Sequence, residues 1–155
     1  MEIKAVNTKY NLANIKHKVF LGGAIDNGSA EDWQKKLVDI LDREDILLFN
    51  PRRSDWNVNW SPVAENKEFS EQVNWELDHI ELSQINIFYF PEHSKAPITL
   101  LELGLCLAKK PEKTFVFCHP NFYRIGNVEI TTNRYKGNFY TNLEEFLNRL
   151  KEELK

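Results

Sequence analysis

Residues that cross-link small proteins or bind metals are scarce in this sequence. Only 2 of its 155 residues are cysteines and 4 are histidines, and none of them falls into a CxxC, HxH or HExxH pattern. This argues against a disulfide framework and against a zinc site, and we expect no metal. Cys106 lies in an apolar helical pattern and Cys118 at the end of an apolar strand pattern, so both are expected to be buried thiols of a cytoplasmic protein.

Long apolar runs and an excess of one charge are also missing. No apolar run approaches the roughly 20 residues that a membrane span requires, and the first residues lack the apolar stretch of a secretory signal. The 20 Lys and Arg residues against 23 Asp and Glu residues give a net charge of −3. This argues against binding to nucleic acid polymers or to anionic membranes. The Gly-rich phosphate-binding patterns GxGxxG and GxxxxGKS/T do not occur.

The composition that is present is that of one globular domain. Hydrophobic residues make up 42% and charged residues 28%, and a chain of this length buries roughly 70% of the surface that its unfolded form exposes. Residues 1–17 have no clear period and are expected to be an extension that packs as an edge or interface arm. Residues 18–155 are expected to form the single domain.

Strand-like and helix-like periods alternate along the chain. Apolar strand patterns occupy residues 18–24, 45–50, 85–90 and 114–118, with a weak candidate at 128–131. Helical spacing occupies residues 30–43, 68–82, 97–109 and 141–155, and residues 51–66 read as a long loop. Ser29 or Asn27 is the expected cap of the first helix. The alternation predicts an α/β fold with a parallel sheet covered by helices on both faces.

Ligands of such sheets bind beyond the carboxyl ends of the strands, and this predicts where the functional residues lie. The candidates are Gly22, Gly23 and Asp26 after the first strand, Arg52, Arg53, Asp55 and Trp56 after the second, Ser94 after the third, and Asn127 after the fourth. Arginine can bind a phosphate with two parallel hydrogen bonds and tryptophan can stack on a base, so the loop after the second strand suits a nucleoside or nucleotide. Tryptophans in a long loop can equally pin it to the body of the protein.

Glu102 is the most informative single residue. It lies in ITLLELGLCLA, residues 98–108, where 8 of 11 residues are apolar, and an ionised carboxylate is almost never buried without a partner. This favours a functional site. The alternative is a capping box from Thr99 to Glu102. A helix that begins at Pro97 puts Glu102 in its second turn, beyond capping range.

Two further acids, Glu76 and Asp78, lie on the preceding helix. Positions i and i+2 are about 200° apart on a helix, so the two carboxylates cannot face the same way. One of them is expected to face solvent. Asp78 is the one that could reach the mouth of the sheet, although a solvated surface role fits it as well.

Four segments together resemble the nucleoside 2-deoxyribosyltransferase-like family, in a short branch found in bacterial and phage genomes. They are VFLGGAI at the first strand, NPRR after the second, QVNWELDHIELSQINIFYFP through the second helix and third strand, and PITLLELGLCLA around Glu102. The resemblance covers residues 18–127. It implies a flavodoxin-like or Rossmann-like three-layer sandwich with a mostly parallel five-stranded sheet, and a homodimer or higher homo-oligomer whose pockets are completed by a neighbouring subunit.

The resemblance also implies roles for individual residues. Glu102 matches the catalytic nucleophile and Asp78 its acidic partner near the leaving base. Gly22 and Gly23 match small residues that let the backbone approach the substrate, and Asn127 matches an asparagine donated across the interface. The sequence departs from the family where Ser94-Lys95-Ala96 replaces an acidic loop, where Asn86 replaces an aspartate and where Phe20 replaces a tyrosine.

The activity implied is cleavage or exchange of the N-glycosidic bond of a nucleoside, without a metal or organic cofactor. An ionised Glu102 attacks the anomeric carbon, the protonated Asp78 assists the departing base, and a second base or water then attacks the covalent sugar ester. Two alternatives stay open. One is an N-glycosidase of nucleosides or nucleoside 5'-monophosphates, favoured if Arg52 and Arg53 reach a phosphate. The other is a non-catalytic module that binds a nucleotide. The altered loop at Ser94 is the feature that favours this alternative.

Overall fold

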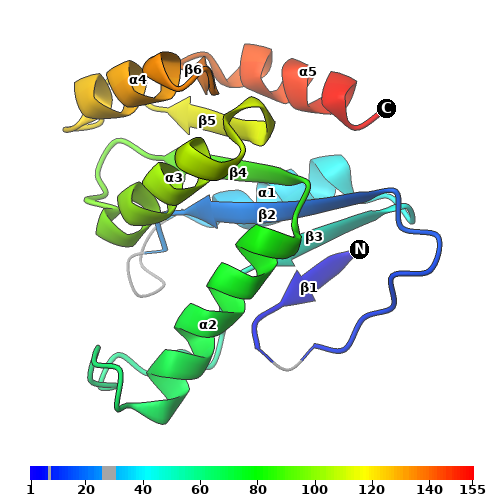
Figure 1. Ribbon diagram of the computed structural model, residues 1–155, viewed down its shortest axis with the longest axis vertical. Coiled ribbons are helices and arrows are strands. Elements are labelled where there is room, and N and C mark those ends of the chain that lie inside the picture. Colours follow the sequence, from blue (N-terminus) through cyan, green and yellow to red (C-terminus); the bar gives the residue numbers. More distant parts are fainter. Residues whose placement is uncertain (7, 26–30) are drawn as a thin grey trace.

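The computed structural model describes residues 1–6, 8–25 and 31–155 (Figure 1). Its elements in chain order are β1 (Glu2–Lys4), β2 (His17–Gly23), α1 (Trp33–Leu41), β3 (Ile46–Asn50), α2 (Lys67–Leu82), β4 (Ile85–Phe90), α3 (Pro97–Lys109), a short 3-10 helix (Pro111–Lys113), β5 (Thr114–Cys118), α4 (Ile125–Arg134), β6 (Asn138–Tyr140) and α5 (Leu143–Glu153). Among these described residues, no helix combines the length and the apolar character that crossing a bilayer requires.

The strands form one parallel sheet in the order β1-β3-β2-β4-β5-β6. This confirms the predicted α/β fold, with six strands where the resemblance implied five. The sixth is β1, which pairs with β3 through Glu2 and Leu48 and makes the amino-terminal residues an edge of the sheet. The chain's ammonium group holds this edge in place, because it donates to the carbonyl of Ile46 at 2.7 Å.

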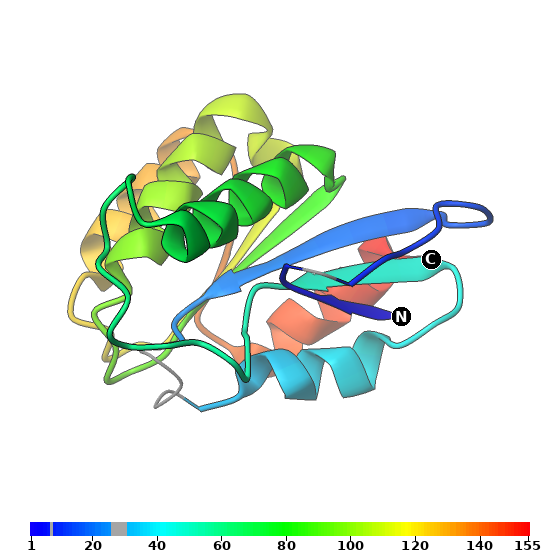
Figure 2. The same ribbon diagram turned by 90° about the horizontal axis from the view of Figure 1, so that it is seen from below.

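Helices cover both faces of the sheet, as Figure 2 shows: α2, α3 and α4 lie on one face and α1 and α5 on the other. The two cores follow from the period of two along the strands. Along β4, Ile85 and Ile87 pack with α1 and α5, whereas Phe88 and Phe90 pack beneath α2 and α3. Both predicted thiols, in α3 and at the end of β5, are buried and free.

The strand predicted at residues 128–131 is wrong, because this segment is helical within α4. Its β-branched residues have strand propensity, but Val128 and Thr132 are buried one helical turn apart against the sheet and β6. The helical period therefore prevailed over local propensity. The strand that follows β5 comes later, at β6.

The first turns of two helices bear on the site. Asn27 and Ser29, the predicted caps of α1, lie outside the described residues, and the helix begins later with Asp32 as its N-cap, accepting from the amide of Lys35 at 3.0 Å. Helix α3 begins at Pro97, as predicted, and its N-cap residue makes no side-chain cap. Glu102 is thus in the second turn and takes no part in a capping box.

Candidate active site

The site lies where the chain changes direction across the sheet. From β2 the chain passes through α1 to β3 on one side, then crosses back through α2 to β4 on the other side of β2. Connections that diverge in this way leave a crevice at the carboxyl ends of the two central strands. Two surface hollows, of about 350 and 430 Å³, lie elsewhere, near the carboxyl ends of α2 and α3 and the amino ends of the strands.

Two carboxyl groups meet on the helices that follow β3 and β4. Glu102, on α3, is 7% exposed, and Glu76, on α2, is half-buried. Their side chains are hydrogen-bonded to each other. Two carboxylates in direct contact cannot both be charged, so the pair retains a proton at neutral pH and titrates as one unit.

The environment of the pair decides where that proton lies. Burial first, then the charge of Glu76 and the hydrogen bond to it, raise the pKa of Glu102 to about 9. Burial also raises the pKa of Glu76, against the opposing effect of hydrogen bonds from Gln72 and Glu102. Because Gln72 donates a hydrogen bond to Glu76 and so stabilises its ionised form, we expect Glu102 to hold the shared proton in the free protein. The sequence alone had led us to expect an ionised Glu102.

Gln72 and Arg53 extend this pair toward the loop of residues 51–66. The Gln72 amide nitrogen donates to Glu76 at 2.7 Å and to the carbonyl of Pro51 at 3.0 Å. Arg53 donates to the Gln72 amide oxygen at 3.4 Å and makes two bonds of 2.8 Å to Asp55. A continuous set of hydrogen bonds thus joins the loop after β3 to the buried carboxyl pair.

The same loop is held by its aromatic residues. The Arg53 guanidinium lies 5.2 Å from the centre of the Trp60 ring. Trp56 packs edge-on against Trp60 at 5.1 Å and against Phe69, in the first turn of α2, at 6.4 Å. These contacts support the interpretation in which the tryptophans pin the loop to the body of the protein.

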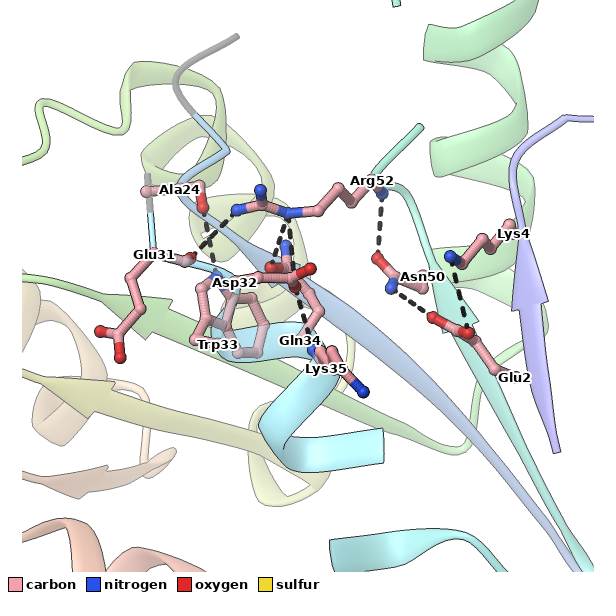
Figure 3. Close-up of polar contacts among 10 residues, drawn as sticks. All are labelled: Glu2, Lys4, Ala24, Glu31, Asp32, Trp33, Gln34, Lys35, Asn50 and Arg52. Atoms are coloured by element: carbon pink, nitrogen blue, oxygen red, sulfur yellow. Dashed lines mark hydrogen bonds and ion pairs between the residues drawn. The ribbon is translucent and has the colours of Figure 1, made fainter. Parts of the chain in front are cut away.

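Arg52 fastens the same loop to the start of α1 (Figure 3). Its guanidinium donates to the side chain of Gln34 at 3.2 Å and to the carbonyl of Glu31 at 3.0 Å, and it lies 3.5 Å from Asp32. Its backbone amide donates to Asn50 at 2.9 Å. The side chain is only 14% exposed. Arg52 therefore joins the segments that follow β2 and β3.

Comparison with known proteins places this arrangement in a family. A family model described as "Nucleoside 2-deoxyribosyltransferase like" matches residues 16–122, more than half of the chain. The chain belongs to the nucleoside 2-deoxyribosyltransferase-like family. Its matched region contains β2 to β5 and both carboxyl groups of the pair.

The fold is also shared with a solved structure. A crystal structure of a conserved protein from Enterococcus faecalis V583 matches with a TM-score of 0.60 at 11% identity, over 88% of this chain and 98% of that chain. At this identity the likeness concerns the fold alone. The comparison with curated proteins gave no match.

The structure brings Glu76, and not Asp78, into contact with Glu102. Asp78 is exposed on α2, whereas Glu76 is the acid bonded to Glu102. A signal in the sequence was available for this choice: Gln72, Trp75, Glu76, His79 and Ile80 form one helical stripe, spaced 3, 4, 7 and 8 residues from its first member. Gln72 itself was not among the predicted site residues.

The glycines at the end of β2 are required by packing. A Cβ atom on Gly22 would lie 2.7 Å from the Phe88 ring, and one on Gly23 would lie 2.4 Å from the Trp33 ring. Neighbouring aromatic side chains thus occupy the space that each glycine leaves. Asp26, also predicted to bind substrate, lies outside the described residues.

The remaining predicted residues lie at the edges of the site. Ser94 is buried in the loop before α3, where its hydroxyl accepts from the amide of Ala96 at 3.1 Å. Ala96 has a φ of 44°, an uncommon left-handed conformation for a residue with a Cβ atom, directly before the helix that carries Glu102. Asn127 is exposed on α4. Within the described part of the chain, no three His, Cys, Asp or Glu side chains group as metal ligands.

Proposed function

We propose that the protein breaks the N-glycosidic bond of a nucleoside, with Glu102 as nucleophile and Glu76 as the acid that protonates the leaving base. The observation that carries this proposal is the hydrogen bond between the buried Glu102 carboxyl group and Glu76, in a chain of the nucleoside 2-deoxyribosyltransferase-like family. A pair that holds one proton supplies both functions at once: one carboxylate to attack and one acid to donate.

The reaction follows from the single proton of the pair. With substrate bound, the proton moves across the hydrogen bond from Glu102 to Glu76. The Glu102 carboxylate then attacks the anomeric carbon, the C–N bond breaks with its electrons going to the base, and the base takes the proton from Glu76. The product is a sugar ester of Glu102. A second base, or water, attacks the same carbon, releases the Glu102 carboxylate and gives its proton to Glu76.

The two arginines of NPRR bear on the choice between nucleosides and nucleoside 5'-monophosphates. Arg52 and Arg53 would favour a phosphate if their guanidinium groups faced substrate. Instead they bond to Gln34 and Asp32, and to Asp55 and Gln72. We therefore propose an uncharged nucleoside as substrate, with 2'-deoxyribose as the sugar that the family description names.

The direct test is incubation with thymidine, with and without adenine. A new nucleoside indicates transfer and free sugar indicates hydrolysis, and either supports the proposal. Glu102→Gln is expected to abolish turnover, while Glu71→Gln, an exposed acid on α2, serves as the matched control. A 2'-fluorinated deoxynucleoside should leave a sugar adduct on Glu102 in intact-mass analysis. Nucleotide binding that survives Glu102→Ala, with no turnover by the parent protein, would instead establish the binding module.

We also propose that the chain assembles with copies of itself through the outer face of α3. Leu101 is 72% exposed and Ile98 57% exposed, and the two lie about one turn apart on the helix that carries Glu102. Large apolar side chains that gather in this way usually mark an interaction surface. Self-association would bury them, in keeping with the oligomers that the family resemblance implies.

A further inference from the structure

Gln72 is the one amide side chain on α2 that faces the carboxyl pair, and it is almost fully buried. Its exposed fraction is 4%, so each of its polar atoms needs a partner within the protein. The amide nitrogen has two acceptors, the Glu76 carboxyl oxygen and the Pro51 carbonyl, and the amide oxygen has one donor, Arg53. All of its main hydrogen-bonding capacity is used.

Only one orientation of this amide satisfies these partners. Turning it by 180° would place its oxygen against the Pro51 carbonyl and the Glu76 carboxyl oxygen, and its nitrogen against the Arg53 guanidinium. Each of these contacts would be repulsive, because acceptors would face acceptors and donors would face donors. Arg53 is itself fixed by Asp55 and by the Trp60 ring, so the orientation of the amide is determined from the loop after β3.

The orientation matters because Gln72 presents a donor to Glu76. A donor to a carboxyl oxygen stabilises the ionised form of that group over the protonated form. Among the residues that the structure describes, Glu76 is the only side chain hydrogen-bonded to Glu102, and Cys106 is the titratable group one turn further along α3. The two carboxyl groups therefore differ in proton affinity because of a hydrogen bond made on α2, from Gln72 to Glu76.

We propose that Gln72 is a positioning residue: held by Arg53, its amide keeps Glu76 against Glu102 and determines which of the two carboxyl groups holds their shared proton. The catalytic meaning of this inference rests on the proposed function, because the proton concerned is the one that the leaving base would receive. The position of the proton in the free protein can be measured without substrate. Loop residues 51–66 would thereby influence the chemistry without touching the sugar.

The test is a titration of the two carboxyl carbons by NMR in ¹³C-labelled protein, with assignments from Glu76→Gln and Glu102→Gln. In Gln72→Met, which keeps the side-chain size and loses the donor, the acid-side step of the pair is expected to move up by about one pH unit. The alkaline step should change little, because Glu76 is ionised, and would accept from Gln72, both before and after it. Arg53→Met should give a smaller shift in the same direction. Asn74→Met is the matched control, since that amide is exposed and donates to Ser70 within its own helix.

A parallel readout comes from turnover. The acid limb of kcat/KM against pH should move with the acid-side NMR step in Gln72→Met, a change that mere loss of packing would not produce. If Gln72→Met fails to fold, Gln72→Glu is tested instead. A glutamate at position 72 can pair with Arg53 and carries no donor when it is ionised. It should raise the pH of the acid-side step at least as much. An acid-side step that stays at the parental pH in the folded variant overturns the inference.

The two proposals fail separately. A shifted acid-side step in a protein that turns over no nucleoside would uphold the placement of the proton by Gln72 and refute the glycosidic function. Turnover that requires Glu102 but keeps its pH profile in Gln72→Met would do the reverse.

Discussion

The carboxyl pair should cost the protein stability, and Glu102→Gln measures how much. Glu102 keeps its proton in the folded protein up to about pH 9, whereas a free glutamate loses it near 4.5. The contribution of this group to stability is therefore fully present below its unfolded pKa and is lost as the pH rises through its folded pKa. Folding consequently becomes less favourable with rising pH across the neutral range.

The magnitude follows from the width of that window. Each pH unit in it removes about 1.4 kcal/mol, so about 4 kcal/mol is the upper limit between pH 5 and pH 8. Effective dielectric constants at buried sites are higher than in a dry interior, and we expect about half of this limit. A glutamine at position 102 has the size of a protonated glutamate and still donates to Glu76, so it should keep the contact without the cost.

We therefore expect Glu102→Gln to be more stable than the parent by about 2 kcal/mol near pH 8, a rise in Tm of about 4–8 °C, and nearly equal to it near pH 5. Urea denaturation at both pH values measures the difference, and comparison with the parent cancels the titration of other groups. Glu71→Gln, on the exposed side of α2, is the control and should show no such gain. A Glu102→Gln protein that is less stable than the parent near pH 8 would refute the reasoning.

Three further predictions concern the partner acid, the packing of β2 and the surface of α3. Glu76→Gln is expected to slow nucleoside turnover about 100-fold or more, and Asp78→Asn less than about twofold. A larger effect of Asp78→Asn would show that Asp78, and not Glu76, is the catalytic acid. Gly23→Ala should destabilise the fold by about 1–3 kcal/mol because its Cβ atom overlaps the Trp33 ring, and an unchanged denaturation midpoint would contradict this. Leu101→Glu should reduce the mass measured by light scattering to that of a monomer, and a monomeric parent protein would rule out the interface.

Much of the sheet could be predicted because its information is local. The strands at β2, β3, β4 and β5 are short apolar runs bounded by turn formers, and α2 and α3 have clear helical periods. The failure at α4 has the same origin. Helix α4 has only ten residues, and its β-branched residues favour a strand locally. Its helical conformation therefore depends on burial of one face against the rest of the protein.

The candidate site divides in a similar way. Glu102 could be identified from the sequence because burying a carboxylate within an apolar helix is unfavourable unless it has a partner. Its partner could not, because the choice between Glu76 and Asp78 depends on the rotation of α2 against α3. The arginines show the same limit: Arg52 meets Gln34 and Arg53 meets Gln72, partners 18 and 19 residues away along the chain.

The sequence alone determined the order of strands and helices from β2 to β5, the burial of one acid and the family to which its segments are similar, since each of these depends on periods and patterns within a single segment. Tertiary structure decided which acid faces Glu102, why the arginines turn inward and why the pKa values of both paired carboxyl groups are raised. These depend on the packing of separate segments, because the proton affinity of a carboxyl group is set by the burial and the neighbours that only the folded chain provides.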